Sequence, residues 1–150
     1  MNILKRIILI LFIVFVGIQL IPTTRNQSNG VLATDIIRTY NAPENIKNLL
    51  KTSCYDCHSN NTNYPWYNKI QPVSWLLEGH IKEAKEVLNF SEFGAYSKRR
   101  QKSKLKSIAS QIKDNKMPLP SYTFMHKDAK FSEEEKSLLE NWVSQLIDNL

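Results

Sequence analysis

The chain has 150 residues, a formal net charge of +6 and two cysteines. This length is enough for one small domain beside a targeting segment, and the absence of internal repeats excludes solenoid architectures. Two cysteines cannot form the two separated Cys pairs that are common in structural zinc sites.

Residues 1–21 have the pattern of a secretory signal. Lys5 and Arg6 precede an uncharged, almost wholly apolar run over residues 7–21, as a positive n-region precedes an h-region. No small-residue cleavage site follows this run closely. We therefore expect an uncleaved signal anchor that crosses the inner membrane once, with the rest of the chain in the periplasm. Cleavage, which would leave a periplasmic protein, is the alternative.

Residues 22–40 are predicted to be a flexible linker. The stretch from Pro22 to Thr34 is rich in Thr, Asn, Gln and Ser, and a coil of this length has an end-to-end distance of roughly 20 Å. Such a tether would let a folded domain over residues 41–150 lie close to the membrane and still rotate.

The folded part is predicted to be all-α, because apolar residues recur at helical spacing. Three helices are expected at residues 41–54, 74–88 and 97–113. A fourth, C-terminal helix is the best marked, since Ser132 and Glu135 form a capping box at its start. Its inward stripe comprises Leu138, Leu139, Trp142, Leu146 and Ile147.

The segment Cys54-Tyr55-Asp56-Cys57-His58 is the Cys-x-x-Cys-His sequence to which c-type haem is attached. Its two thiols are spaced to add to the two vinyl groups of one porphyrin. The imidazole that follows is a standard proximal ligand of haem iron. We therefore predict one haem c, bound through thioethers to Cys54 and Cys57 and ligated by His58.

Three other uses of a Cys-x-x-Cys pair compete with haem. A thioredoxin-like redox pair requires a βαβ pattern, for which the sequence offers no convincing strands. Zinc would need further ligands such as His80 or His126, and adjacent Cys57 and His58 are an awkward pair for one tetrahedral ion. A disulfide would close so small a loop that it would constrain little chain entropy. Haem is the favoured interpretation.

The sixth position of the iron would separate an electron carrier from an enzyme. Met117 lies in a proline-stiffened loop before the last helix, and a thioether ligand raises the reduction potential. We expect Met117 to be the sixth ligand, with His126, His80 or an open position as alternatives. Trp66 and Tyr67 are expected to line the haem pocket, where either could hydrogen-bond a propionate; core packing is the ordinary alternative.

Six cations occur between residues 98 and 106. Such a cluster can steer a small carrier toward an acidic partner protein or hold it against anionic lipid. A solvated helix face is the ordinary interpretation of a charge run. Nucleic acid is not an expected partner of an exported protein.

The chain also resembles the bacterial haem-binding domain family, whose members are small exported c-type cytochromes. The likeness covers about residues 42–142. It is carried, in order, by Ser53-Cys54-Tyr55-Asp56-Cys57-His58-Ser59, Tyr64-Pro65-Trp66-Tyr67, Pro72-Val73-Ser74-Trp75, Leu88-Asn89-Phe90-Ser91-Glu92-Phe93, Met117-Pro118-Leu119, Ser121-Tyr122 and His126-Lys127-Asp128-Ala129. The resemblance implies a cytochrome c-like fold around one covalent haem, with His58 proximal and Met117 distal.

These features predict a membrane-tethered monohaem cytochrome c that passes single electrons between redox partner proteins. No catalytic residue is expected, because the iron itself cycles between two oxidation states. The first alternative is a haem enzyme or ligand sensor, such as a peroxidase, with an open or labile sixth position. The second is a non-haem metal or thiol module.

Overall fold

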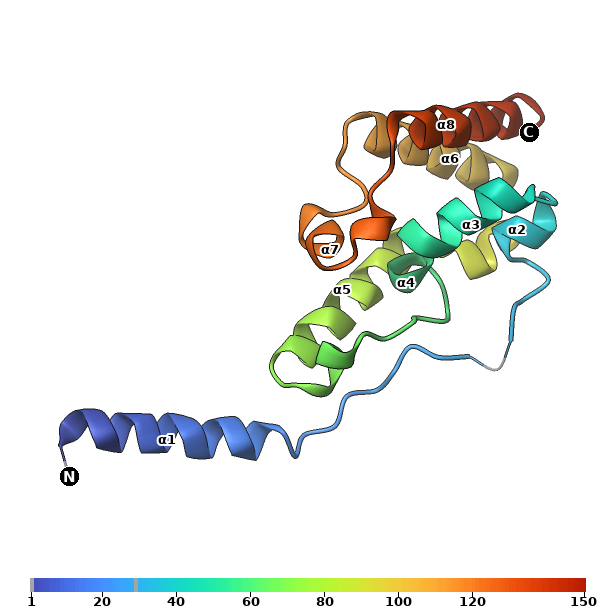
Figure 1. Cartoon of the computed structure of the whole chain (residues 1–150). Coiled ribbons are helices and arrows are strands. Elements are labelled where there is room, and N and C mark those ends of the chain that lie inside the picture. Colours follow the sequence, from blue (N-terminus) through green and yellow to red (C-terminus); the bar gives the residue numbers. More distant parts are fainter. Residues whose placement is uncertain (1, 29) are drawn as a thin grey trace.

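The computed structural model describes residues 2–28 and 30–150; Met1 and Asn29, which fall in the predicted anchor and linker, lie outside the described residues. All regular elements in the described part are helical, which confirms the predicted all-α class (Figure 1). They are α1 (Ile3–Ile18), α2 (Ile36–Thr39), α3 (Glu44–Ser53), α4 (Tyr55–His58), η1 (Trp66–Lys69), α5 (Val73–Val87), η2 (Phe90–Ala95), α6 (Lys98–Lys113), α7 (Pro120–Met125), η3 (Lys127–Ala129) and α8 (Glu133–Asp148).

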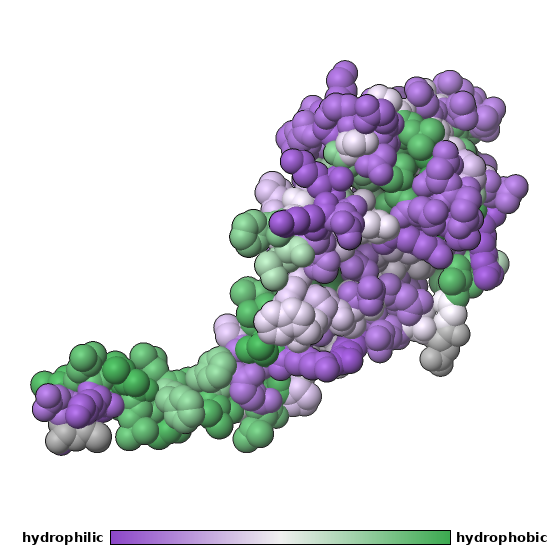
Figure 2. Space-filling view, in the orientation of Figure 1, coloured by the Kyte–Doolittle hydropathy of each residue, from purple (hydrophilic) through white to green (hydrophobic). Residues whose placement is uncertain are grey.

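Helix α1 projects from one end of the folded domain (Figure 1). It has 16 residues, none of them buried, and its surface is hydrophobic except near the N-terminal end (Figure 2). Within residues 2–28 and 30–150, no helix is both long and apolar enough to cross a membrane. The predicted membrane-spanning anchor over residues 1–21 therefore has no support from the helix lengths.

Of the three long helices of the domain, α5 and α6 closely follow the predicted ranges and α8 starts at the predicted capping box. Helices α5 and α6 each lie within one residue of the expected bounds. Helix α8 begins with the predicted capping box, in which the Ser132 amide donates to Glu135 Oε2 at 2.8 Å and the Glu135 amide donates to Ser132 Oγ at 3.2 Å. Periodicity and capping were strong enough here to set the boundaries.

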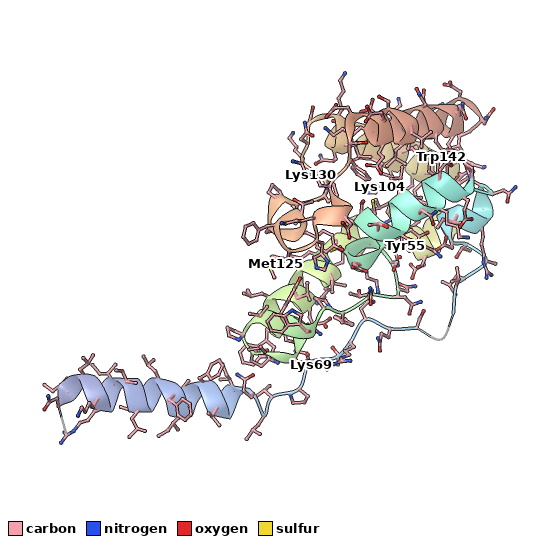
Figure 3. The ribbon with its side chains drawn as sticks, in the orientation of Figure 1. Tyr55, Lys69, Lys104, Met125, Lys130 and Trp142 are labelled. Carbon is pink, nitrogen blue, oxygen red and sulfur yellow. The ribbon has the colours of Figure 1, made fainter. Side chains whose placement is uncertain are left out.

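The core forms where α6 packs against α8 and where α3 contacts α8 (Figure 1). Helix α6 contributes Leu105 and Ile112, and α3 contributes Ile46 and Leu50. Trp142, on α8, packs into the same cluster (Figure 3). The end of α5 and the η2 turn complete this cluster with Leu88, Phe90 and Phe93. Both cysteines follow α3 in the chain. They are therefore attached to a helix whose inner side is anchored in the core.

The folded domain begins before residue 41, so the prediction of a linker over residues 22–40 is wrong at its C-terminal end. Asp35 caps α2 by accepting a hydrogen bond from the Ile37 amide at 2.9 Å, and Ile36 is fully buried. Gly94 packs against this segment so closely that a Cβ there would lie 2.4 Å from Thr39 Oγ1. With four residues, α2 is too short for a helical period to mark it in the sequence.

Residues 19–28, here called the strap, are bound along the domain rather than free. Gln19 and Gln71 exchange two hydrogen bonds, of 2.9 and 3.2 Å. Asn26 is the centre of the contact and binds four residues: its amide N–H donates to Tyr64 Oη at 2.6 Å, its side-chain amide donates to Ser59 O and Thr62 Oγ1, and Lys85 Nζ donates to its Oδ1. The expected free coil is thus a bound segment.

Candidate functional site

Cys54 joins α3 to α4, and Cys57 and His58 lie in the single turn of α4. Cys54 ends α3, where its amide donates to Leu50 O at 2.9 Å. Its own carbonyl then accepts from the Cys57 amide at 3.2 Å and from the His58 amide at 2.9 Å. The two thiols and the imidazole are therefore held in one compact turn.

The His58 ring is held by the C-terminal end of α5. Its Nδ1 lies 3.1 Å from Ala84 O and 3.0 Å from Leu88 O, and carbonyls in the last turn of a helix are available as acceptors. Two acceptors fix the neutral tautomer with its proton on Nδ1. In the described part of the chain only Nδ1 of this ring is hydrogen-bonded, so Nε2 is the nitrogen left for a metal.

Burial keeps His58 in the form that binds metals. The pKa of His58 is lowered because burial disfavours the charged ring, although the Leu88 and Ala84 carbonyls partly oppose this shift. A neutral imidazole is the metal-binding form of histidine. The site therefore offers an oriented, deprotonated nitrogen at neutral pH.

Two aromatic rings support the His58 side chain, Phe90 directly and Tyr55 through Phe90. Phe90 meets the imidazole edge-on, with centroids 6.0 Å apart, and Tyr55 stacks on Phe90 at 5.6 Å. The Tyr55 hydroxyl donates to Asp35 Oδ1 at 2.8 Å. Burial first, and then the Asp35 carboxylate, raise the pKa of Tyr55. The short helix α2 is thus connected to the back of the motif.

Both cysteines are free and half-buried. Burial first, and then the neighbouring Cys57, raise the pKa of Cys54 to about 12. Burial and then Asp56 raise the pKa of Cys57 to about 11. Redox-active Cys-x-x-Cys pairs have the opposite property, a lowered thiol pKa, so the geometry gives no support to a thiol-redox centre.

Met117 lies in a short loop that is attached to the end of α6. The Lys116 and Met117 amides both donate to Gln111 O, at 2.9 and 3.2 Å, and Asn115 turns the chain with a φ of 54°. The Met117 side chain is 36% exposed and lies outside the buried core. It is therefore free of core packing that would fix its rotamer.

The two histidines named as alternative ligands differ in their surroundings. Nε2 of His126 lies 2.9 Å from the Tyr67 hydroxyl, and the His126 ring stacks on Tyr122 with centroids 4.4 Å apart. This nitrogen is already engaged by a protein partner. His80 is exposed on α5.

The two predicted pocket residues differ in exposure. Tyr67 is half-buried and its hydroxyl is hydrogen-bonded to His126. Trp66 is 70% exposed, and its ring meets that of Tyr67 edge-on, with centroids 5.9 Å apart.

Sequence reasoning missed Tyr122, whose hydroxyl donates to Asp56 Oδ2 at 2.7 Å and connects α7 to the motif. Burial and then Asp56 raise the pKa of Tyr122. Because 66 residues separate these partners, no local pattern could have indicated the pair.

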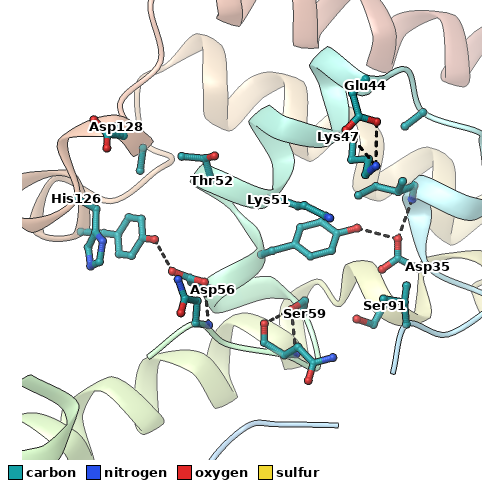
Figure 4. A pocket seen from close by; sticks show the side chains of 18 of the residues that line it. Asp35, Glu44, Lys47, Lys51, Thr52, Asp56, Ser59, Ser91, His126 and Asp128 are labelled. Carbon is teal, nitrogen blue, oxygen red and sulfur yellow. Dashed lines mark hydrogen bonds and ion pairs between the residues drawn. The ribbon is translucent and has the colours of Figure 1, made fainter. Parts of the chain in front are cut away.

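A groove of about 1230 Å³ lies beside the motif. Tyr55 and Asp56 line it, but Cys54, Cys57 and His58 do not. Figure 4 shows Asp56 and His126 among the side chains that line this groove. Tyr122, which also lines it, donates to Asp56 Oδ2. Among the described residues, no three His, Cys, Asp or Glu side chains gather as ligands of a metal ion.

The residues present fit a haem group. Two free thiols adjoin an imidazole whose Nε2 is available, which is the donor set that covalent haem requires. The helix that holds His58 also exposes Val73, Leu76 and Val87, and exposed Met117 and Leu119 follow α6. Apolar side chains of this kind are what a porphyrin packs against.

Residues 13–145 match the family model described as the haem-binding domain, and this range includes nearly all of the folded part. No curated protein matches the chain. No solved structure matches it either.

Proposed function

Because the chain belongs to the haem-binding domain family, we propose that it is a monohaem c-type cytochrome that carries single electrons. Bound haem would supply an iron that gains and loses one electron, so no catalytic side chain is required. The observation that carries the proposal is the fixation of His58 by the Ala84 and Leu88 carbonyls, because it orients Nε2 as a ligand.

Covalent attachment through Cys54 and Cys57 is supported by their chemistry and spacing. Both thiols are free, they are separated by two residues, and the next residue is His58. The turn in which Cys54 O accepts from both the Cys57 and His58 amides keeps these three side chains together. Two thioethers from one such turn would fix a single macrocycle against α5.

We further propose that His58 and Met117 are the two iron ligands. His126 is the weaker candidate because Tyr67 already occupies its Nε2. Among the described backbone hydrogen bonds, the amides of Lys116 and Met117 bind only Gln111 O. The Met117 side chain can therefore adapt to a ligand position. Ligation by His and Met would give a high reduction potential.

The location of the protein is also part of this proposal. Lys5 and Arg6 lie in the first turn of α1, and the apolar side chains that follow them are exposed along most of this helix. An exposed apolar surface of this kind marks a membrane or partner contact. We place α1 in the inner membrane and the haem domain in the periplasm, since cations flank the cytoplasmic end of such segments.

Haem staining of a denaturing gel tests covalent attachment. Full-length protein is expressed with the c-type maturation machinery beside Cys54→Ala, Cys57→Ala and the double variant. We expect haem on the wild-type band, weaker staining of each single variant and none on the double variant. A wild-type band without haem would exclude the cytochrome, and metal analysis for zinc would follow.

The sixth ligand is tested by comparing Met117→Ala with Met125→Ala, which removes an exposed methionine from the adjacent α7. We expect only Met117→Ala to lower the potential and to admit cyanide or carbon monoxide rapidly. Equal behaviour of the two variants would exclude Met117 as a ligand. Fast, tight binding by the wild type would favour the alternative function, a haem enzyme or ligand sensor.

A further inference from the structure

Helix α6 concentrates the positive charge of the molecule. It carries seven Lys and Arg residues and no acidic residue, whereas the whole chain has a formal charge of +6. The rest of the chain therefore sums to −1. Helix α8, packed against α6, carries five acidic residues and one lysine, so the two neighbouring helices have opposite charge.

The cations of α6 are displayed to solvent rather than neutralised within the protein. Gln101, Leu105 and Ile112 are its buried residues. On another side, an exposed stripe recurs at helical spacings of 3, 4 and 7 residues: Arg99, Lys102, Lys106 and Lys113. None of the three ion pairs found among the described residues involves α6.

The stripe ends beside the loop that carries Met117. Lys113 is the last residue of α6, and the Met117 amide donates to Gln111 O within the final turn of the helix. Sixteen residues of α-helix extend about 24 Å. A partner bound along this stripe would therefore cover roughly that length of surface, with one end at the Met117 loop.

We propose that the exposed stripe of α6 is the docking surface for an acidic redox partner protein, which it orients toward the Met117 end of the domain. The inference rests on the proposed electron-carrier function. Figure 1 places α1 and α6 at opposite ends of the molecule, so a bilayer that receives α1 does not also cover α6. This arrangement favours an acidic protein over anionic lipid as the occupant.

Electrostatic docking of this kind acts mainly on association. Complementary charge raises the association rate by about 10- to 1000-fold at low ionic strength, and salt removes the gain because the Debye length falls to about 8 Å at 0.15 M. The stripe should therefore control a salt-dependent second-order rate constant and leave the haem content unchanged.

The test uses the full-length holoprotein and reduced flavodoxin, a strongly acidic flavoprotein, as the probe. Stopped-flow reduction rates are measured against ionic strength for wild type and for Arg99→Glu/Lys102→Glu/Lys106→Glu. Lys51→Glu/Lys82→Glu/Lys130→Glu, at exposed positions outside α6, changes the net charge equally. Arg99→Gln/Lys102→Gln/Lys106→Gln is a milder variant with less risk to folding. Haem stain and absorbance spectrum are recorded for each.

We expect the α6 reversal to slow reduction by about 10- to 100-fold at low salt, the glutamine variant to slow it less, and all rates to converge at high salt. The control reversal should change the rate by less than about threefold. Equal slowing by both reversals would mean that only net charge matters and would overturn the docking surface. Normal haem with unchanged rates would also overturn it, whereas wild type without haem would overturn the proposed function as well.

Lipid is tested separately, by sedimentation of the same variants with phosphatidylglycerol or phosphatidylcholine vesicles. For each vesicle type, we expect the α6 reversal to bind as much as wild type does. Selective loss of phosphatidylglycerol binding by the α6 reversal, with no change in the flavodoxin rate, would assign the stripe to anionic lipid and reject the protein partner.

Discussion

The two proposed iron ligands lie in regions of very different construction. Two carbonyls at the end of α5 and the buried ring of Phe90 hold His58. Met117 is 36% exposed, in a loop whose amides bind Gln111 O. The protein fold itself orients His58, whereas the Met117 side chain has no comparable support. A site built in this way can keep its proximal ligand while its sixth position changes.

Phe90→Ala should cause the largest loss in the free energy of unfolding, because it removes a ring that supports His58. Phe90 is 2% exposed and contacts both His58 and Tyr55, and removal of a buried aromatic ring costs about 3–5 kcal/mol. Phe124→Ala, which removes a ring that is 79% exposed on α7, should cost less than about 0.5 kcal/mol. Denaturant unfolding of both holoproteins measures the difference. Similar losses for the two variants would contradict a rigid proximal side.

The thiols of the haem-free chain should resist alkylation. The pKa of Cys57 is raised from 9.0 to about 11 and that of Cys54 to about 12, so the thiolate fraction below pH 9 falls by about 100-fold or more. Iodoacetamide kinetics at pH 8 should be slower than in urea by this factor and should rise tenfold per pH unit up to about pH 11. Equal rates with and without urea would show that the motif is not folded without haem.

A smaller effect is expected from Asn26→Ala, which releases the strap from the loop after His58. Loss of the Ser59 and Thr62 contacts should cost about 1–3 kcal/mol, or about 2–4 °C in Tm per kcal/mol. Gln27→Ala, at an exposed neighbouring position, is the matched control. A Tm equal to that of the control would mean that the strap adds no stability to the proximal side.

Only a small change in stability should follow Met117→Ala. Its half-exposed side chain lies outside the core, so we expect a loss of less than about 1 kcal/mol in the haem-free chain. The potential of the holoprotein should nevertheless fall, because axial ligands adjust haem potentials over a range of about 0.8 V. A large loss of stability without a change in potential would assign Met117 a packing role instead.

The sequence predicted the parts of the fold that have a periodic or capping signal. Helices α5, α6 and α8 carry apolar faces over 15 or 16 residues, and Ser132 marks the start of α8. Helix α2 has four residues, which is too short for a 3.6-residue period to be recognised. Its role was visible only once Ile36 was seen to enter the core.

The candidate site could be predicted only where one motif contains it. Cys54, Cys57 and His58 are adjacent in the chain, and the structure keeps them in one turn. The carbonyls that hold His58 come from the end of α5, 26 and 30 residues later. Backbone acceptors have no residue signature, so no sequence pattern could have named Ala84 or Leu88 for this task.

The strap has a consequence for how the carrier would meet its partners. A flexible tether of roughly 20 Å would let the haem domain reorient freely above the bilayer and contact several neighbouring proteins in turn. Asn26 and Gln19 instead hold residues 19–28 against the domain, so the haem would keep one height and one heading relative to α1. With α1 in the membrane as proposed, the protein would act as a stationary relay, and its partners would have to diffuse to it.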